Sequence, residues 1–225
     1  MSTSSTIIEP RLLARHPSST DGIEISLHTL PKQLLREFRH VFRDEYLSFP
    51  SDARSGAAVA SGGAIPGGDD MMAMSEGQGG TDGMVLLALP TNQRAREDLV
   101  AVGDHIEAEK DRLLNVFMEF GGDISQKLRS KGYWADYIDP CSGLPMLTLN
   151  CNKVYSEVDG MECLLNYRAY NAGFCKILTH PKWGSAVYPA TIFAYCPVDV
   201  AKDVLTGYPS AVPDDVGAKS DKMED

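Results

Sequence analysis

A cysteine, a lysine and a histidine lie close together in the stretch G-F-C-K-I-L-T-H-P-K-W-G, in the last third of the chain. Cys175 is followed directly by Lys176, and His180 comes five residues later. A thiol with an ordinary pKa of about 8.5 becomes an effective nucleophile or metal donor when a cation or an imidazole assists its ionisation. On a strand, however, Lys176 points to the face opposite Cys175. We therefore expect Cys175 to be a buried structural cysteine rather than an activated nucleophile.

Residues 132–143 read G-Y-W-A-D-Y-I-D-P-C-S-G and combine aromatic, acidic and thiol side chains. Asp136 and Asp139 could act as a general acid and base. Asp139 precedes Pro140, however, and D-P-C-S-G is typical of a turn in which the aspartate accepts backbone N–H bonds. We therefore predict that Asp139 forms a turn and that neither acid is catalytic. Three aromatic residues are expected to pack as a core corner beside this turn: Tyr133, Trp134 and Tyr137.

The cysteines do not form a metal-binding pattern. The chain has five cysteines, and no two of them form the C-x-x-C pair that grips zinc. His105 and Glu109 lie one helical turn apart, but such a pair is more often a solvated helix face than a metal site. We therefore expect free thiols and no metal centre.

Composition favours one globular domain and excludes several classes of partner. With 225 residues and 43% hydrophobic content, the chain can bury a sizeable core. Its net charge of −10 argues against nucleic-acid and anionic-membrane surfaces, because phosphates require clustered lysine and arginine. No apolar run is long enough to predict a membrane span. The first residues lack the apolar core of a secretory signal and are faintly similar to a mitochondrial presequence, so we expect a cytosolic location, with a mitochondrial one as the alternative.

Periodicity predicts a mixture of helices and strands over residues 23–208, in one domain. Apolar residues at helical spacing predict two helices, over residues 30–47 and 110–131. Gly121 and Gly122 weaken the second helix, and residues 98–107 are ambiguous between helix and strand. Apolar, β-branched and aromatic runs predict three strands, over residues 84–89, 175–178 and 186–195. Pro189 restricts the last of these to a sheet edge or a bulge.

Three segments are too polar or too rich in glycine to bury a core, and we predict that they are disordered. These segments are residues 1–22, the glycine-rich insertion 51–83 and the acidic tail 209–225.

The two motifs above, in this order, resemble the cblD protein family (methylmalonic aciduria and homocystinuria type D protein). The likeness extends back through L-L-R-E-F-R-H-V-F and the helix end L-R-S-K-G, and covers most of residues 25–205 apart from the insertion. The family resemblance implies an α+β fold, a nitroreductase-like sandwich with a mostly antiparallel sheet flanked by helices and no bound flavin. The following residues stand in the shared motifs: Tyr133, Trp134, Asp136, Asp139, Pro140, Gly143, His180, Trp183 and Gly184.

The resemblance also implies a function without catalysis: a vitamin B12 trafficking adaptor. It implies docking on a cblC-type cobalamin-processing protein (MMACHC) and delivery of cobalamin to methionine synthase, to methylmalonyl-CoA mutase, or to both. Cobalamin is then held only in the complex, where a cysteine thiolate, a soft donor, bonds the cobalt. The family form has two adjacent cysteines here, and this chain has Phe174 at the first position and Cys175 at the second. Cys175 is therefore the first candidate ligand, and Cys141 is the reserve.

Two other functions compete with the adaptor. A flavin-dependent nitroreductase-like oxidoreductase would need a cationic cluster or exposed helix N-termini for the flavin phosphate, whereas the basic residues here are scattered. A thiol redox protein would need a close cysteine pair, which the sequence lacks.

Overall fold

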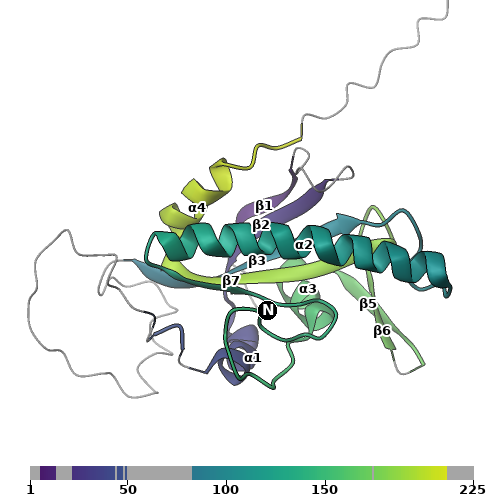
Figure 1. Ribbon diagram of the computed structural model, residues 1–225, viewed down its shortest axis with the longest axis horizontal. Helices are drawn as coiled ribbons and strands as arrows, with labels where there is room; N and C mark the ends of the chain where they lie inside the picture. The colour runs from purple at the N-terminus through teal and green to yellow at the C-terminus, as the bar shows by residue number, and fades with distance from the viewer. Residues whose placement is uncertain are drawn as a thin grey trace, which may run out of the picture.

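An antiparallel sheet of five strands forms the centre of the molecule, in the order β1-β2-β3-β7-β4 (Figure 1). The computed structural model describes residues 6–13, 22–43, 45–47, 49, 83–173 and 175–211. The strands are β1 (Thr6–Leu12), β2 (Ile23–Thr29), β3 (Met84–Arg94), β4 (Trp134–Tyr137) and β7 (Val187–Pro197). The expectation of an α+β fold with a mostly antiparallel sheet is confirmed.

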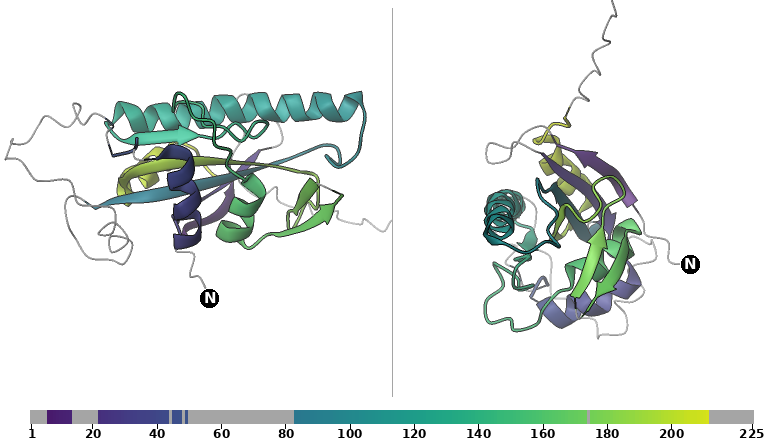
Figure 2. Two further views of the ribbon diagram at one scale, coloured as in Figure 1. Left: turned by 90° about the horizontal axis from the view of Figure 1, so that it is seen from below. Right: turned by 90° about the vertical axis from the view of Figure 1, so that its right-hand side faces the viewer.

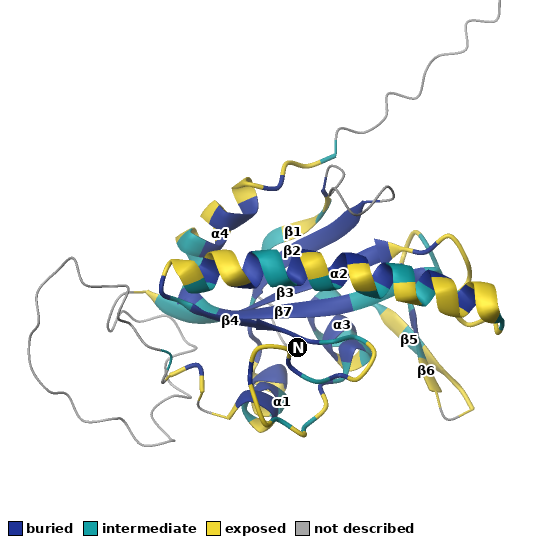
Figure 3. Ribbon diagram, viewed as in Figure 1, coloured by how far each residue is buried: buried dark blue, intermediate teal, exposed yellow. Residues whose placement is uncertain are grey.

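Helices cover both faces of this sheet and make a sandwich of three layers (Figure 2). They are α1 (Lys32–Phe42), α2 (Asp104–Ser130), α3 (Glu157–Leu165) and α4 (Val198–Thr206). One apolar cluster joins α2 and α4 to one sheet face, and a second joins α1 and α3 to the other. Because both faces are covered, β7 is buried along most of its length, as Figure 3 shows.

Strand alternation divides the side chains between the two clusters. Along β7, Ile192 and Ala194 pack toward α2, whereas Phe193 packs toward α1. The β2 residues Ile23, Ile25 and Leu27 likewise lie in the α2 cluster. Intervening polar residues of β2 face the other layer and are buried as well.

A two-stranded hairpin stands apart from the main sheet. It consists of β5 (Arg168–Ala172) and β6 (Cys175–Thr179), and its pairing begins with Ala172 opposite Cys175. Most of its residues are exposed, and only Leu178 is buried. The hairpin is attached at the end where β6 leads into the loop before β7 (Figure 1).

The predicted helices and strands are confirmed, with shifted ends. Of the residues 98–107, which were ambiguous between helix and strand, the last four are helical, since α2 begins at Asp104. β3 continues past Pro90 because the residues that follow keep pairing with both neighbouring strands. The ring of Tyr137 explains the glycines in α2: a Cβ on Gly121 would lie 3.1 Å from that ring, so Gly121 lets β4 approach the helix closely.

Two predictions of disorder are wrong in part. Residues 6–13 of the predicted segment 1–22 include β1, which pairs with β2 as an edge strand. Arg11 fixes β1 further by donating to the carbonyl oxygens of Leu205 (2.9 Å) and Tyr208 (3.1 Å), beyond the end of α4. In the predicted tail, Ser210 bridges to Leu13 and the Ala211 N–H bonds the Leu12 carbonyl at 2.9 Å. Main-chain pairing, together with the packing of Ile7, Ile8 and Leu13 on the α2 cluster, orders this part of the chain, and composition alone does not reveal it.

Pro189 lies in an interior strand, at a position where only one of the two neighbouring strands is paired with it. β7 as a whole lies between β3 and β4, so the expectation of an edge strand is wrong for the element. β4 pairs only with residues 192–195 of β7, however, and Pro189 lies beyond that stretch. The predicted insertion 51–83, except Gly83, and residues 14–21 and 212–225 lie outside the described residues.

Candidate functional site

Cys175 lies at the exposed tip of the β5–β6 hairpin. The connection to Ala172 has two residues, and its Gly173 has φ +62°, a conformation that favours glycine. Our prediction of a buried structural cysteine is wrong. The hairpin extends beyond the layers that cover the main sheet (Figure 1), and the Cys175 thiol is exposed.

The two potential activating groups near Cys175 in sequence are engaged elsewhere. The Lys176 ammonium pairs with Asp159 and Glu162 of α3, and hydrogen bonds to these two carboxylates raise the pKa of Lys176. His180 is five residues further along the strand, about 16 Å away at ~3.3 Å per residue. The Lys176 ammonium and the His180 imidazole thus bond groups other than the Cys175 thiol. The site therefore offers an accessible thiol without a built-in base.

His180 is the centre of a buried hydrogen-bond cluster at the base of the hairpin. Its Nδ1 accepts the backbone N–H groups of Lys182 (3.1 Å) and Trp183 (3.2 Å). The proton therefore sits on Nε2, which donates to Glu24 Oε1 at 3.1 Å. The indole of Trp183 stacks on the imidazole with 3.9 Å between ring centroids. His180 thus joins the end of β6 to strand β2.

Glu24 receives a second bond from Tyr167, whose hydroxyl donates to Glu24 Oε1 at 2.9 Å. Burial acts to raise the pKa of Glu24, but the hydrogen bonds from His180 and Tyr167 outweigh it and hold the pKa below its ordinary value. The carboxylate is therefore ionised and anchors the hairpin from both ends of its base. Gly184 completes the turn: it exchanges backbone bonds of 2.9 and 3.0 Å with His180 and has φ +58°.

Sequence reasoning missed Glu24 and Tyr167. Glu24 alternates with apolar residues in I-E-I-S-L-H-T, a pattern that normally places the polar set in water. Here the second face is covered too, so Ser26 and His28 are also buried and hydrogen-bond each other at 2.8 Å. The sequence signal for this cluster was the set of three polar or charged residues, Glu24, Ser26 and His28, at alternate positions of a strand whose other positions are apolar.

The predicted core packing is found for Trp134 and Tyr137, but these two rings lie on opposite faces of the sheet and do not form one corner. Trp134 is buried and meets the rings of Phe38 (5.7 Å), Phe42 (5.1 Å) and Tyr46 (6.1 Å) in edge-on contacts. Tyr137 packs on the opposite face against Phe117 of α2, with centroids 6.0 Å apart. Tyr133 is half-buried at the edge of the α2 cluster. The aromatic residues of this motif therefore fix β4 between the two helical layers.

Asp136 organises the loop that follows β4. Its carboxylate is fully buried and accepts four backbone N–H bonds, from Tyr137 (2.7 Å), Met146 (3.2 Å), Leu147 (2.9 Å) and Thr148 (2.7 Å). Burial raises the pKa of Asp136, and the bonds from Thr148, Leu147 and Tyr137 oppose this rise. With its lone pairs occupied by backbone donors, Asp136 has a structural role.

The predicted Asp-Pro turn is present. Asp139 accepts from the N–H of Cys141 (2.9 Å) and the hydroxyl of Ser142 (2.6 Å). Pro140 is half-buried in the turn, and Cys141 is exposed on it. Gly143 has φ +71°, and a Cβ there would collide with the Val154 side chain, so no other residue fits without displacement.

The candidate residues therefore fall into separate groups. One is the exposed hairpin tip with Cys175, and the second is the buried base with His180, Trp183 and Gly184. The third is the β4 motif and its turn with Cys141. In the part of the chain that the structure describes, no three His, Cys, Asp or Glu side chains form a group able to hold a metal ion. None of the helices described is long and apolar enough to cross a membrane.

Comparison with known proteins assigns the family. Residues 73–204 match the family model described as methylmalonic aciduria and homocystinuria type D protein. The cobalamin trafficking protein CblD of Homo sapiens is 33% identical over 108 residues, which are 48% of this chain and 36% of that protein. The protein of the same name from Rattus norvegicus is 32% identical over 114 residues, 51% of this chain and 38% of the relative. The match thus spans well under half the length of these relatives. Since the family model covers more than half of the chain, the chain belongs to the methylmalonic aciduria and homocystinuria type D protein family.

Proposed function

We propose that the chain is a cobalamin trafficking adaptor that has no catalytic activity of its own. Family membership supports this proposal, together with relatives whose name describes cobalamin trafficking. The buried acids and His180 are occupied by structural hydrogen bonds, which agrees with a binding rather than a catalytic role. The alternative of a flavin-dependent oxidoreductase finds no support in the family or in these relatives.

The adaptor docks on a cblC-type cobalamin-processing protein (MMACHC) and directs cobalamin to methionine synthase, methylmalonyl-CoA mutase, or both. In this proposal cobalamin is held only in that complex, as the family resemblance implies. The expected location is the cytosol, with a mitochondrial pool if methylmalonyl-CoA mutase is served. We also propose that the three-layer sandwich belongs to the nitroreductase-like folds, on the basis of its antiparallel sheet between helices.

Cys175 supplies a thiolate to the cobalt in the complex. The observation that carries this assignment is its exposure at the hairpin tip, where a cobalt centre held by another protein can reach it. Cys141, exposed on the Asp139 turn, is the second candidate. The other three thiols are less accessible: Cys196 is buried, with its pKa raised to about 12 by that burial, and Cys151 and Cys163 are half-buried.

The test is the visible absorption spectrum of cobalamin. The chain is mixed with a cblC-type protein carrying reduced, dealkylated cobalamin, and a shift of the cobalt bands is expected for the parent chain. Cys175→Ser should abolish the shift, because a hydroxyl offers no comparable anionic donor, while leaving complex formation intact. Cys141→Ser is the matched control and should keep the shift. A shift that survives in Cys175→Ser but is lost in Cys141→Ser would contradict the assignment.

A further inference from the structure

Apolar side chains are exposed together on the loop between β4 and α3. We call residues 144–154 the apolar loop. Leu149 and Val154 are 77% and 62% exposed, and Met146 and Leu147 are exposed as well. Isolated exposed apolar residues are ordinary, but several in one short loop indicate an interaction surface.

The backbone of the apolar loop is fixed although its side chains are exposed. Buried Asp136 bonds three successive N–H groups, those of Met146, Leu147 and Thr148. At the far end, the Tyr155 N–H bonds the Gly143 carbonyl at 2.8 Å. A loop that is already held in one conformation loses little conformational entropy when a partner binds. This is the property of a preformed docking site.

Basic side chains cover the adjacent helix α1. Between Lys32 and Arg43 the chain has four lysine or arginine residues and one acid, Glu37, whereas the whole chain carries a net charge of −10. Arg36 and His40 are exposed and lie one turn apart on α1, and Arg43 is exposed directly after the last helical residue. We call these three residues the basic stripe.

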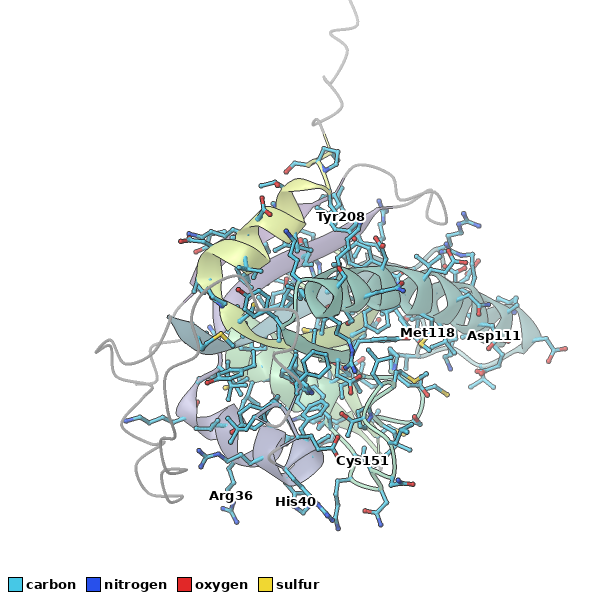
Figure 4. All side chains as sticks on the ribbon, turned by 60° about the vertical axis from the view of Figure 1, so that its left-hand side comes forward. Arg36, His40, Asp111, Met118, Cys151 and Tyr208 are labelled. Atoms are coloured by element: carbon cyan, nitrogen blue, oxygen red, sulfur yellow. The ribbon has the colours of Figure 1, made fainter. Side chains whose placement is uncertain are left out.

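The apolar loop and the basic stripe are neighbours. The Cys151 thiol bonds the Val41 carbonyl at 3.1 Å, and the Ser156 N–H bonds Glu37 Oε1 at 3.0 Å. Glu37 and Val41 each follow a stripe residue by one position, which places them about 100° around the helix axis from it. The loop therefore contacts a side of α1 that adjoins the stripe. Figure 4 shows Arg36 and His40 pointing away from the body of the molecule. Cys151 lies beside the end of α1 that carries His40.

We propose that the apolar loop and the basic stripe together form the surface on which the cblC-type protein docks, and that the partner presents carboxylates beside an apolar patch. This inference rests on the proposed function and adds where docking takes place. The charges indicate which kind of partner surface fits. The chain has a net charge of −10, so an acidic surface of the partner is repelled by most of the chain but attracted by the basic stripe. The apolar loop supplies the desolvated centre of the contact, and the stripe supplies its charged rim.

The experiment measures the Kd of the full chain for the cblC-type protein by calorimetry at low and at physiological salt. Leu149→Asp places a charge at the centre of the apolar loop and should weaken binding about 10-fold or more. Arg36→Glu should weaken binding several-fold at low salt, and the loss should shrink as salt screens the rim charges. Both positions are exposed, so neither change disturbs the core.

Matched controls make the same changes elsewhere. Val102, 94% exposed before α2, receives Val102→Asp, and exposed Lys202 on α4 receives Lys202→Glu. Both controls should bind as the parent does. If the parent binds and the loop and stripe variants bind equally well, the surface is assigned wrongly although the adaptor function stands. If the controls lose as much affinity as the loop and stripe variants, the surface assignment is also overturned. If the parent does not bind the cblC-type protein at all, the proposed function fails, and this inference fails with it.

Discussion

Glu157 is a carboxyl group buried where α3 meets the sheet. It accepts the N–H (3.0 Å) and the hydroxyl (2.6 Å) of Thr191 on β7. Burial raises the pKa of Glu157 from 4.5 to about 8, although the bonds from Thr191 oppose the rise. At neutral pH the folded chain therefore holds this carboxyl in its protonated form, and the group joins α3 to β7 without a buried charge.

This proton makes stability depend on pH. Between pH 4.5 and 8 the folded state binds a proton that the unfolded state has released. The free energy of unfolding therefore falls as pH rises through this window and stops changing for this group above about 8. Glu157→Gln, which is neutral at every pH, should show a smaller fall between pH 5 and 8 in denaturant titrations. The surface change Glu107→Gln serves as the control and should keep the parent slope.

An unchanged slope in Glu157→Gln would contradict the assignment of the bound proton to this carboxyl. The direction of the effect is opposite to that of an exposed ion-paired acid, whose contribution is lost as pH falls.

At the residue scale, the sequence predicts turns and aromatic packing better than it predicts burial of polar groups. The Asp139 turn follows from local chemistry, because the bonds to Cys141 and Ser142 are made within three residues. The role of Asp136 depends on backbone groups ten to twelve residues away, and that of Glu24 on His180, far along the chain. Such long-range partners cannot be identified from the local sequence. Cys175 was predicted to be buried because the local sequence does not show that its strand forms a hairpin apart from the main sheet.

The β5–β6 hairpin is the element that carries the candidate cobalt ligand, and its base is locked by His180. His180 and Tyr167 bond Glu24, and Trp183 packs with Met161, Leu178 and Val187 in a small apolar cluster. The Lys176 ion pairs to α3 lie on the surface, where such pairs contribute about 0–1 kcal/mol. The buried cluster around His180 should therefore contribute most of the stability that holds the base of the hairpin in place.

His180→Ala tests this lock. The variant leaves Glu24 with one partner fewer and two backbone N–H groups without their acceptor, a loss of about 2–4 kcal/mol for this region. Hydrogen exchange should become faster in residues 167–184 while the amides of α2 and β3 keep their protection. Lys176→Ala is the control and should exchange nearly as the parent does. Equal protection of residues 167–184 in His180→Ala and the parent would show that the hairpin is held by other contacts.

At the element scale, periodicity located the long helices because α1 and α2 each pack one apolar stripe on the sheet. It did not locate β1 or the interior position of β7. The strand β1 contains Ile7, Ile8 and Leu12, but these do not alternate with polar residues, so no strand period is visible and the pairing with β2 is not predicted. The order of strands in the sheet depends on contacts between distant segments. The helix α3 also went unpredicted, since it has only nine residues and contains Gly160.

The whole molecule combines a rigid sandwich with two exposed features on its surface. The hairpin tip presents a thiol, and the apolar loop beside the basic stripe presents exposed apolar side chains next to arginine side chains. The interior is closed by helices on both sheet faces, and the buried side chains of Asp136, His180 and Glu157 form hydrogen bonds within the chain. This arrangement suits a protein that works by contacts at its surface, as an adaptor does.

Size-exclusion chromatography with absorbance recorded at 280 nm and in the visible region tests the adaptor function most directly. The chain, cobalamin and the cblC-type protein are run alone, in pairs and together. We expect the chain to elute colourless by itself and after mixing with cobalamin, and to elute with both cobalamin and the cblC-type protein in one earlier peak. A yellow chain that carries flavin, a chain that retains cobalamin without the partner, or separate elution of the two proteins would contradict the adaptor function.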